Sequence, residues 1–217
     1  MGDAEKPKEN REEQSKATTC TRGEIEEEMN EKSTEYFDVY TIHGKSTGAL
    51  VRRDVIHAEG LWHRTVHIWF YTPEGELIIQ KRSKTKKSHP GLWDSSVAGH
   101  VDPGESPVRA SVREISEELG ARVKEEELGF IGSRNLSITS NGGTYIDNEI
   151  TFAYILLWHD NNTLSPDPRE VEEVKYIKLD AFRRALTDPR QAKEFVPHGG
   201  DYYTWIFDAV ENALSHR

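Results

Sequence analysis

The stretch GHVDPGESPVRASVREISEELGA, residues 99–121, ends in three glutamates within five positions, Glu114, Glu117 and Glu118. Like charges at helical spacing repel one another, so a cluster of this kind needs a physical reason. The commonest reason is a solvated helix face, which requires nothing beyond charge. The residues around these glutamates favour a built site instead.

Residues 106–119 are expected to form a helix. Ser106 suits the N-cap, Pro107 suits the first helical position, and Gly120 suits the end of the helix. An apolar stripe predicts the face that packs on the core, and it consists of Val108, Val112, Ile115 and Leu119. The glutamates share a neighbouring face. Converging carboxylates need a cation between them, and Mg²⁺ prefers oxygen ligands of this type.

The whole stretch resembles the Nudix box, G-x5-E-x7-R-E-U-x-E-E-x-G-U, in which U is a bulky aliphatic residue. Ile115 fills the first aliphatic position, and Ala121 is smaller than the pattern asks at the second. The fixed positions that match are Gly99, Glu105, Arg113, Glu114, Glu117, Glu118 and Gly120. The resemblance to the Nudix hydrolase superfamily implies an α/β protein, with a Nudix-type α/β/α sandwich around a mixed β-sheet.

The resemblance also implies a chemistry, the Mg²⁺-dependent hydrolysis of a diphosphate linked to another group X, with Mn²⁺ as a substitute cation. The implied metal ligands are Glu114, Glu117, Glu118 and the Gly99 carbonyl. Glu117 and Glu118 also count as catalytic residues, while Arg113 and Glu105 would hold the loop against the helix. The metal would orient the diphosphate and lower the pKa of a bound water.

Outside the box, the segment LIIQKRSKTKKSHPGLWDSSVAGHVDPGE, residues 77–105, resembles the isopentenyl-diphosphate isomerases and the Nudix hydrolases close to them. This resemblance implies that Arg82 and Lys86 bind the substrate diphosphate. An acidic protein needs such local positive charge to attract an anion. The neighbouring lysines are Lys81, Lys84 and Lys87, and an exposed basic loop is the alternative for each of them.

The isomerases also bind a metal through histidines and an acidic pair. Near those positions this chain has His57, His63 and His100, although the spacing between the first two matches only roughly, and Asp147 and Glu149 match the acidic pair. The resemblance therefore implies a second metal site from these five residues, with structural histidines as the alternative. Glu149 also matches the distal glutamate that many Nudix hydrolases use as a metal ligand or catalytic base.

Position 98 separates the enzymatic alternatives. The isomerases use a cysteine as an acid/base in the motif SVCGH, where this chain reads SVAGH over residues 96–100. Ala98 has no proton to transfer, so isomerase activity is disfavoured. We therefore predict a hydrolase of a nucleoside-diphosphate-type or isoprenoid-type substrate. An isopentenyl-diphosphate isomerase and a non-catalytic diphosphate sensor are the alternatives, and the intact set of carboxylates argues against the sensor.

The composition limits the partners. The 217-residue chain has a formal net charge of −10, which argues against binding a nucleic acid polymer. No apolar run is long enough to span a membrane, so no membrane partner is expected. A single cysteine, Cys20, fits a reducing compartment, and without a signal-peptide pattern the cytoplasm is the expected location. The expected partner is a small-molecule diphosphate, and the oligomeric state is left open.

Residues 1–33 are expected to be a disordered acidic tail, because they cannot bury enough apolar surface, and residues 34–217 are expected to be the Nudix hydrolase domain. The expected strands are 35–42, 65–72, 76–82, 95–101, 128–138, 145–158 and 174–179, and the further helices are 180–188 and 202–214. Pro73-Glu74-Gly75 predicts a hairpin. The chain between the first strand and Leu61 is expected to be extended or irregular.

Overall fold

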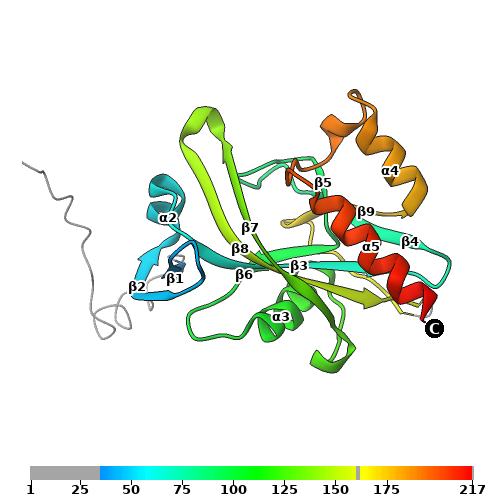
Figure 1. Ribbon diagram of the computed structural model, residues 1–217, viewed down its shortest axis with the longest axis horizontal. Coiled ribbons are helices and arrows are strands. Elements are labelled where there is room, and N and C mark those ends of the chain that lie inside the picture. Colours follow the sequence, from blue (N-terminus) through cyan, green and yellow to red (C-terminus); the bar gives the residue numbers. More distant parts are fainter. Residues whose placement is uncertain (1–34, 160–161, 217) are drawn as a thin grey trace, which may run out of the picture.

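The central feature of the computed structural model, which describes residues 35–159 and 162–216, is a seven-stranded mixed sheet (Figure 1). Its strands are β3 (His63–Tyr71), β4 (Glu76–Arg82), β5 (Trp93–Asp94), β6 (Val97–His100), β7 (Gly129–Ser140), β8 (Tyr145–Leu157) and β9 (Val171–Lys178). β3 runs parallel to β8 and antiparallel to β4 and β6. The predicted mixed sheet is confirmed, and the expected tail lies outside the described residues.

The predicted hairpin joins β3 to β4, but these strands pair only close to their turn, where Tyr71 lies opposite Leu77. Farther from the turn, β4 pairs with β5 and β3 pairs with β6, while β9 pairs with the other edge of β4 along its whole length. In that register Val66 lies opposite Gly99 and His67 lies opposite Ala98. The separation of the two strands therefore places the start of the Nudix-like stretch beside the centre of the sheet.

Helix α3 (Pro107–Leu119) follows the sequence pattern closely. The Ser106 hydroxyl accepts a hydrogen bond from a backbone N–H of the first turn, and Gly120 ends the helix in the left-handed region with φ of 64°. Ile115 and Leu119 are fully buried against the sheet, which contributes about 1.5–3 kcal/mol for each side chain. The predicted helix and its apolar face are confirmed.

Two helices cover the opposite face of the sheet, α4 (Leu179–Thr187) and α5 (Tyr202–Ser215) (Figure 1). Phe182 and Ile206 pack there in an apolar cluster with Trp69, whereas α3 packs on a separate cluster. The sheet thus lies between two helical layers, which confirms the α/β/α sandwich. Within residues 35–159 and 162–216, no helix is long and apolar enough to cross a membrane.

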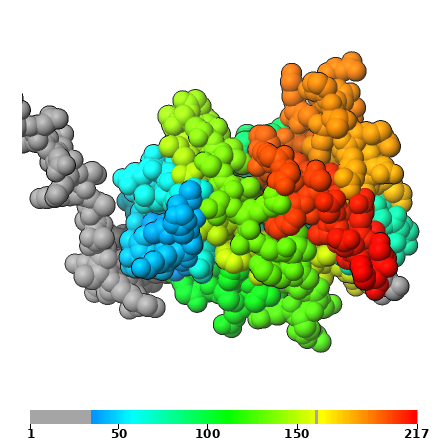
Figure 2. Space-filling view, viewed as in Figure 1, coloured from blue at the N-terminus to red at the C-terminus, as the bar shows by residue number. Residues whose placement is uncertain are grey.

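A smaller unit precedes the sandwich. β1 (Tyr36–Tyr40) and β2 (Ser46–Arg52) form a two-stranded sheet, and α2 (Arg53–Glu59) packs on it through the fully buried Ile56. Figure 2 shows β1 and β2, in blue, at the opposite end of the visible face from α5, in red.

The expectation of an extended or irregular chain up to Leu61 is wrong for α2, which spans seven residues. Its N-cap makes no side-chain hydrogen bond, so the sequence carries little local helix signal. A helix this short depends on tertiary packing rather than on propensity. The consequence for the site is that α2 delivers His57 to the interior.

Candidate active site

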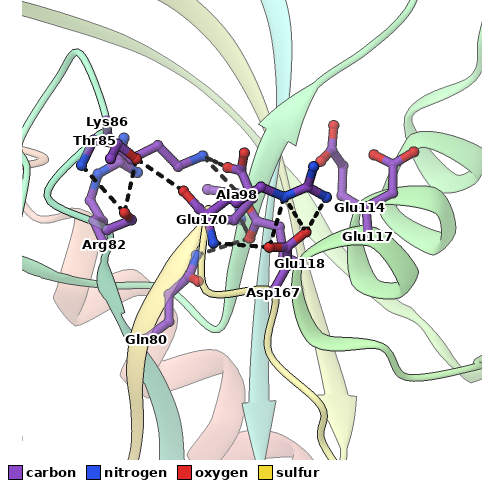
Figure 3. Close-up of polar contacts among 12 residues, drawn as sticks. Gln80, Arg82, Thr85, Lys86, Ala98, Glu114, Glu117, Glu118, Asp167 and Glu170 are labelled. Atoms are coloured by element: carbon purple, nitrogen blue, oxygen red, sulfur yellow. Dashed lines mark hydrogen bonds and ion pairs between the residues drawn. The ribbon is translucent and has the colours of Figure 1, made fainter.

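The three glutamates of α3 line one wall of a cavity of about 870 Å³. The side chain of Glu118 is 4% exposed and that of Glu114 is 13% exposed, whereas Glu117 is 58% exposed. Glu118 accepts hydrogen bonds from Gln80 Nε2 at 2.9 Å and from the Ala98 backbone N–H at 3.3 Å. These contacts fix the buried carboxylate against β6, while Glu117 stays open to solvent (Figure 3).

Gly99 allows Glu114 to approach β6. A Cβ atom on residue 99 would lie 2.0 Å from Glu114 Cδ and 2.2 Å from its Oε1, so any other residue would displace the carboxylate. The close approach explains the glycine at this position. It also places the Glu114 carboxylate directly beside the Gly99 backbone, as the predicted ligand set requires.

Arg113 links the helix, the loop and the glutamates. Its Nη1 donates to Glu114 Oε1 at 2.8 Å and to Glu117 Oε2 at 3.2 Å. Its Nη2 donates to Glu105 Oε2 at 2.9 Å and to the His100 carbonyl at 2.8 Å. Arg113 and Glu105 therefore tie the loop to α3, as predicted. In this structure the Glu114 and Glu117 carboxylates are joined through the Arg113 guanidinium, which donates to both of them.

Two of the glutamates are strongly affected by their surroundings. Burial, reinforced by repulsion from Glu118, raises the pKa of Glu114 to about 8. Burial also raises the pKa of Glu118 to about 7, against the opposing effect of Lys86. Both carboxyl groups therefore tend to keep their protons near neutral pH. A divalent cation would favour the ionised forms and release those protons.

The basic loop approaches the cavity from the side opposite the glutamates, as Figure 3 shows for Arg82 and Lys86. Lys86 Nζ lies 3.8 Å from Glu118 Oε1 and also pairs with Glu170. Arg82 donates to Asp94 Oδ2 at 3.1 Å, and two of its nitrogens donate to the Ser88 carbonyl. Both side chains line the cavity, but Lys86 lies at the glutamates, whereas Arg82 holds the loop in shape.

A second cluster collects histidines from three elements. His57 of α2, His63 of β3 and His100 of β6 place their ligand atoms within 4.8 Å of one another. Asp147 and Glu149 of β8 form a second such group with His63. Asp147 Oδ1 lies 3.3 Å from His57 Nε2 and 3.6 Å from His63 Nε2. The structure thus brings together all five residues predicted for a second metal site.

The backbone orients two of these rings. His57 Nδ1 lies 2.6 Å from the Arg53 carbonyl and His63 Nδ1 lies 3.0 Å from the Leu61 carbonyl. A carbonyl only accepts, so both Nδ1 atoms carry a proton, and in a neutral ring the Nε2 atom then presents a lone pair. The Nε2 atoms of His57, His63 and His100 are buried without a hydrogen-bond partner among the described residues. Histidines that bind metals are oriented in this way.

The charge state of this cluster also suits a cation. Burial lowers the pKa of His63 to about 4 and that of His100 well below its usual range, so both rings are neutral. Burial, together with the charge of Asp147, raises the pKa of Glu149 well above its usual range. Lone pairs that face carboxyl oxygens repel one another, and a cation between them would remove that repulsion.

Sequence reasoning missed several polar residues that line the cavity, among them His67, Asp94 and His198. One signal for His67 was available, because residues 63, 65 and 67 are all polar and lie on one face of the strand. His198 follows an irregular segment and carries no comparable signal. Its contact with Asp94, at 2.8 Å between Nε2 and Oδ1, exists only in the folded chain.

Comparison with known proteins gives one family. The NUDIX domain model matches residues 61–199. An uncharacterized Nudix hydrolase of Clostridium acetobutylicum is 38% identical, with 81% of this chain and 97% of that protein covered. Nudix hydrolase 3 of Arabidopsis thaliana is 33% identical over 81% of this chain, which spans only 23% of that protein's length. An isopentenyl-diphosphate Delta-isomerase of Escherichia coli is 29% identical, with 70% of this chain and 82% of that protein covered.

Solved structures agree on the fold. A crystal structure of a Deinococcus radiodurans protein superposes with a TM-score of 0.56 at 22% identity, and the match covers 82% of this chain and 98% of that chain. The family match extends over the box helix, the basic loop and most of the sheet. The chain therefore belongs to the Nudix hydrolases, enzymes that act on phosphorus-containing anhydrides.

Proposed function

We propose that this chain uses a bound Mg²⁺ to hydrolyse the diphosphate linkage of a small molecule in which diphosphate is joined to another group X. The observation that carries the proposal is the contact between Gly99 and Glu114, beside the buried Glu118. Carboxylates and a backbone carbonyl make an oxygen-only donor set, which suits Mg²⁺ and accepts Mn²⁺. The raised pKa values of Glu114 and Glu118 support this fit, since a cation would stabilise their ionised forms.

In this proposal the glutamates Glu114, Glu117 and Glu118 and the Gly99 carbonyl hold the cation. When bound, it would neutralise the diphosphate and lower the pKa of a coordinated water. The ammonium group of Lys86 attracts the diphosphate from the opposite wall, and Arg82 keeps the basic loop in place while adding positive charge. Glu149 lines the same cavity, and its raised pKa suits a group that exchanges a proton beside the substrate.

The histidine cluster supports a second, chemically different cation site. His57, His63 and His100 offer three imidazole nitrogens, with Asp147 and Glu149 as oxygen ligands. Nitrogen-rich sets of this kind suit Zn²⁺, Mn²⁺ or Fe²⁺ better than Mg²⁺. We place the structural or catalytic second metal there and the Mg²⁺ at the glutamates.

The runner-up is an isopentenyl-diphosphate isomerase, which the similarity to the Escherichia coli isomerase favours. The local chemistry argues against it. Ala98 contributes only its backbone N–H, which donates to Glu118, and has no side chain that could exchange a proton. A complete set of box glutamates fits a hydrolase instead, because in the proposed hydrolysis these glutamates hold the cation.

A screen of diphosphate compounds tests the proposal. Nucleoside-diphosphate-linked compounds and isoprenoid diphosphates would be incubated with the protein, and the release of phosphate or of phosphorylated products would be followed with and without Mg²⁺. We expect release from at least one class, abolished by EDTA. Absence of release from both classes with Mg²⁺ and with Mn²⁺ would contradict the proposal.

A further inference from the structure

A polar wall inside the cavity belongs neither to the glutamates nor to the histidine cluster. His67 of β3 and His198 before α5 are 4% and 6% exposed, line the cavity, and have ring centroids 5.0 Å apart. In the sheet, His67 lies opposite Ala98 of β6 on one side and opposite Ala153 of β8 on the other. Small neighbours leave the imidazole edge uncovered at the place where an isomerase would carry its cysteine.

The hydrogen bonds around His67 fix its tautomer. Trp69 Nε1, which can only donate, gives a hydrogen bond of 3.1 Å to the Tyr202 hydroxyl. The Tyr202 oxygen lies 2.6 Å from His67 Nδ1, and among the described residues that nitrogen is its remaining partner. Since a buried hydroxyl proton needs an acceptor, Tyr202 donates to Nδ1. The proton of the neutral His67 ring is therefore on Nε2.

The Nε2–H group of His67 is left with unmet bonding capacity. Its closest charged neighbour, Glu149 Oε2, is 4.0 Å away, which is beyond hydrogen-bond distance. Next to it, His198 Nε2 donates to the Asp94 carboxylate. The other ring nitrogen, His198 Nδ1, is buried and has no hydrogen-bond partner among the described residues. A hydrocarbon against this wall would leave these groups unsatisfied, whereas a polar group would satisfy the exposed donor.

We propose that His67 is a specificity-determining residue, whose Nε2–H donates to an oxygen or nitrogen atom of group X close to the diphosphate. The site then selects a hydroxylated or otherwise polar X over a hydrocarbon. This inference rests on the proposed hydrolysis and narrows its substrate class. Trp69 and Tyr202 act as positioning residues, because they set the tautomer without reaching the cavity themselves.

A matched pair of five-carbon substrates tests this inference, ribose 5-diphosphate and isopentenyl diphosphate, which both present a phosphoanhydride for the same cleavage. We expect kcat/KM for the ribose compound to exceed that for the isopentenyl compound by at least about 10²-fold, because sites built to hydrogen-bond a substrate reject analogues without the polar group. His67→Leu should lower this ratio by about 10- to 100-fold. The loss should fall on the ribose compound.

Two further variants separate recognition from folding. Tyr202→Phe keeps the His67 ring but removes the hydroxyl that sets its tautomer, so it should lower the ratio about 3- to 10-fold. His89→Asn changes a different histidine of the cavity lining, at a left-handed position that asparagine tolerates, and should leave the ratio unchanged. Equal losses on both substrates in His67→Leu, or a native preference for isopentenyl diphosphate, would overturn the inference.

Imidazole ¹⁵N NMR supplies a readout that needs no turnover. The His67 signals, assigned from their loss in His67→Leu, should show a neutral ring protonated at Nε2. Ribose 5-diphosphate should shift the Nε2 resonance, and isopentenyl diphosphate should not. An Nδ1–H tautomer, or no shift with the ribose compound, would overturn the inference. Failure of the hydrolysis itself would instead appear as the absence of product from both substrates.

Discussion

The glutamate site on α3 and the histidine cluster lie on one cavity but are built in opposite ways. The glutamate site takes all its side-chain ligands from one helix, offers only oxygen, and keeps Glu117 largely exposed. The histidine cluster draws on α2, β3, β6 and β8, offers mainly nitrogen, and buries His57 and His63 almost completely. An open oxygen site suits a cation that meets substrate, and a closed nitrogen site suits a resident one.

Electrostatics sharpens this contrast. At the glutamate site, burial raises the pKa of Glu114 and Glu118, so the fold disfavours the ionised carboxylates. At the histidine cluster, burial lowers the pKa of His63 and His100, so the fold disfavours their positively charged forms. In both places a bound metal ion would supply positive charge without a proton. The two sites should nevertheless differ in which metal they hold and in how much turnover depends on it.

The largest expected effect comes from removing a box ligand. Glu118→Gln and Glu117→Gln should each lower kcat of the Mg²⁺-dependent reaction by about 10²- to 10⁴-fold, because each removes charge that the transition state requires. Steady-state kinetics with the best substrate of the screen would measure this. Glu125→Gln, at an exposed glutamate of the neighbouring 3-10 helix, is the matched control and should stay within about twofold of the native protein. Full activity of Glu117→Gln and Glu118→Gln would remove the metal-site assignment.

A smaller and different effect is expected at the histidine cluster. His57→Gln should weaken Zn²⁺ binding at least about tenfold, since it removes an imidazole ligand, while Mg²⁺-dependent kcat falls by less than about tenfold. Titration calorimetry with each metal alone would measure the affinities. His43→Gln, at an exposed histidine outside the cluster, should leave them unchanged. Equal loss of Mg²⁺ and Zn²⁺ binding in His57→Gln would mean that the two regions form a single site.

Sequence reasoning reached these two regions unequally, for a physical reason. The residues of α3 follow one another along a single helix, so their spacing alone places Glu114, Glu117 and Glu118 on one face. The proximity of Gly99 to Glu114 follows from the short loop between β6 and α3. Family resemblance was needed to associate His57 with Asp147, because the helix that carries His57 has no local signal.

Apart from the alternation that marks His67, the polar wall formed by His67 and His198 could not be predicted from the sequence. Its hydrogen bonds join residues far apart in the chain, such as His67 and Tyr202, which are 135 positions apart. A tautomer depends on which partner reaches Nδ1, and spacing does not encode that. Gln80 is a similar case, since its contact with Glu118 depends on how β4 packs under α3. Local pattern therefore predicted the cluster of glutamates on one helix face, whereas the hydrogen bonds of the polar wall depend on the tertiary structure.

The pH dependence of stability should distinguish the two regions in the metal-free protein. The glutamates have folded pKa values of about 8 and about 7 against an ordinary value of 4.5, so the folded state binds more protons and stability falls as pH rises toward 8. His63 has a folded pKa of about 4 against an ordinary value of 6.5, so the unfolded state binds more protons between these values and stability rises with pH there. Above pH 6.5 His63 adds no further pH dependence, and the raised carboxyl pKa values of Glu114, Glu118 and Glu149 make stability fall with pH.

Thermal unfolding with EDTA should therefore show Tm falling by several degrees from pH 6.5 to 8. Glu118→Gln should flatten this fall, because glutamine does not ionise, and saturating Mg²⁺ should also flatten it by stabilising the ionised glutamates. The same slope in native protein and Glu118→Gln would show that Glu118 does not carry a raised pKa.

The smallest effect is expected at Ala98, where the comparison between hydrolase and isomerase is decided by one side chain. Ala98 of β6 lies opposite His67 of β3, and its backbone N–H donates to Glu118. Its methyl side chain means that the native chain has no titratable group at position 98. The native protein should therefore incorporate no deuterium into isopentenyl diphosphate from heavy water. Ala98→Cys introduces a thiol, with Glu149 on the same cavity as its prospective acid/base partner.

General acid–base catalysis requires correct distance as well as the right groups, and Ala98→Cys alone does not position an alkene between residues 98 and 149. We therefore expect at most trace deuterium incorporation by Ala98→Cys, measured by mass spectrometry. Hydrolysis should change less than about threefold, because the Ala98 backbone contact with Glu118 is retained. Ala98→Ser adds similar bulk without an acidic proton of comparable pKa and serves as the control. Substantial incorporation by the native protein would reverse the order of the two activities, since another group would then supply the proton that the isomerases take from cysteine.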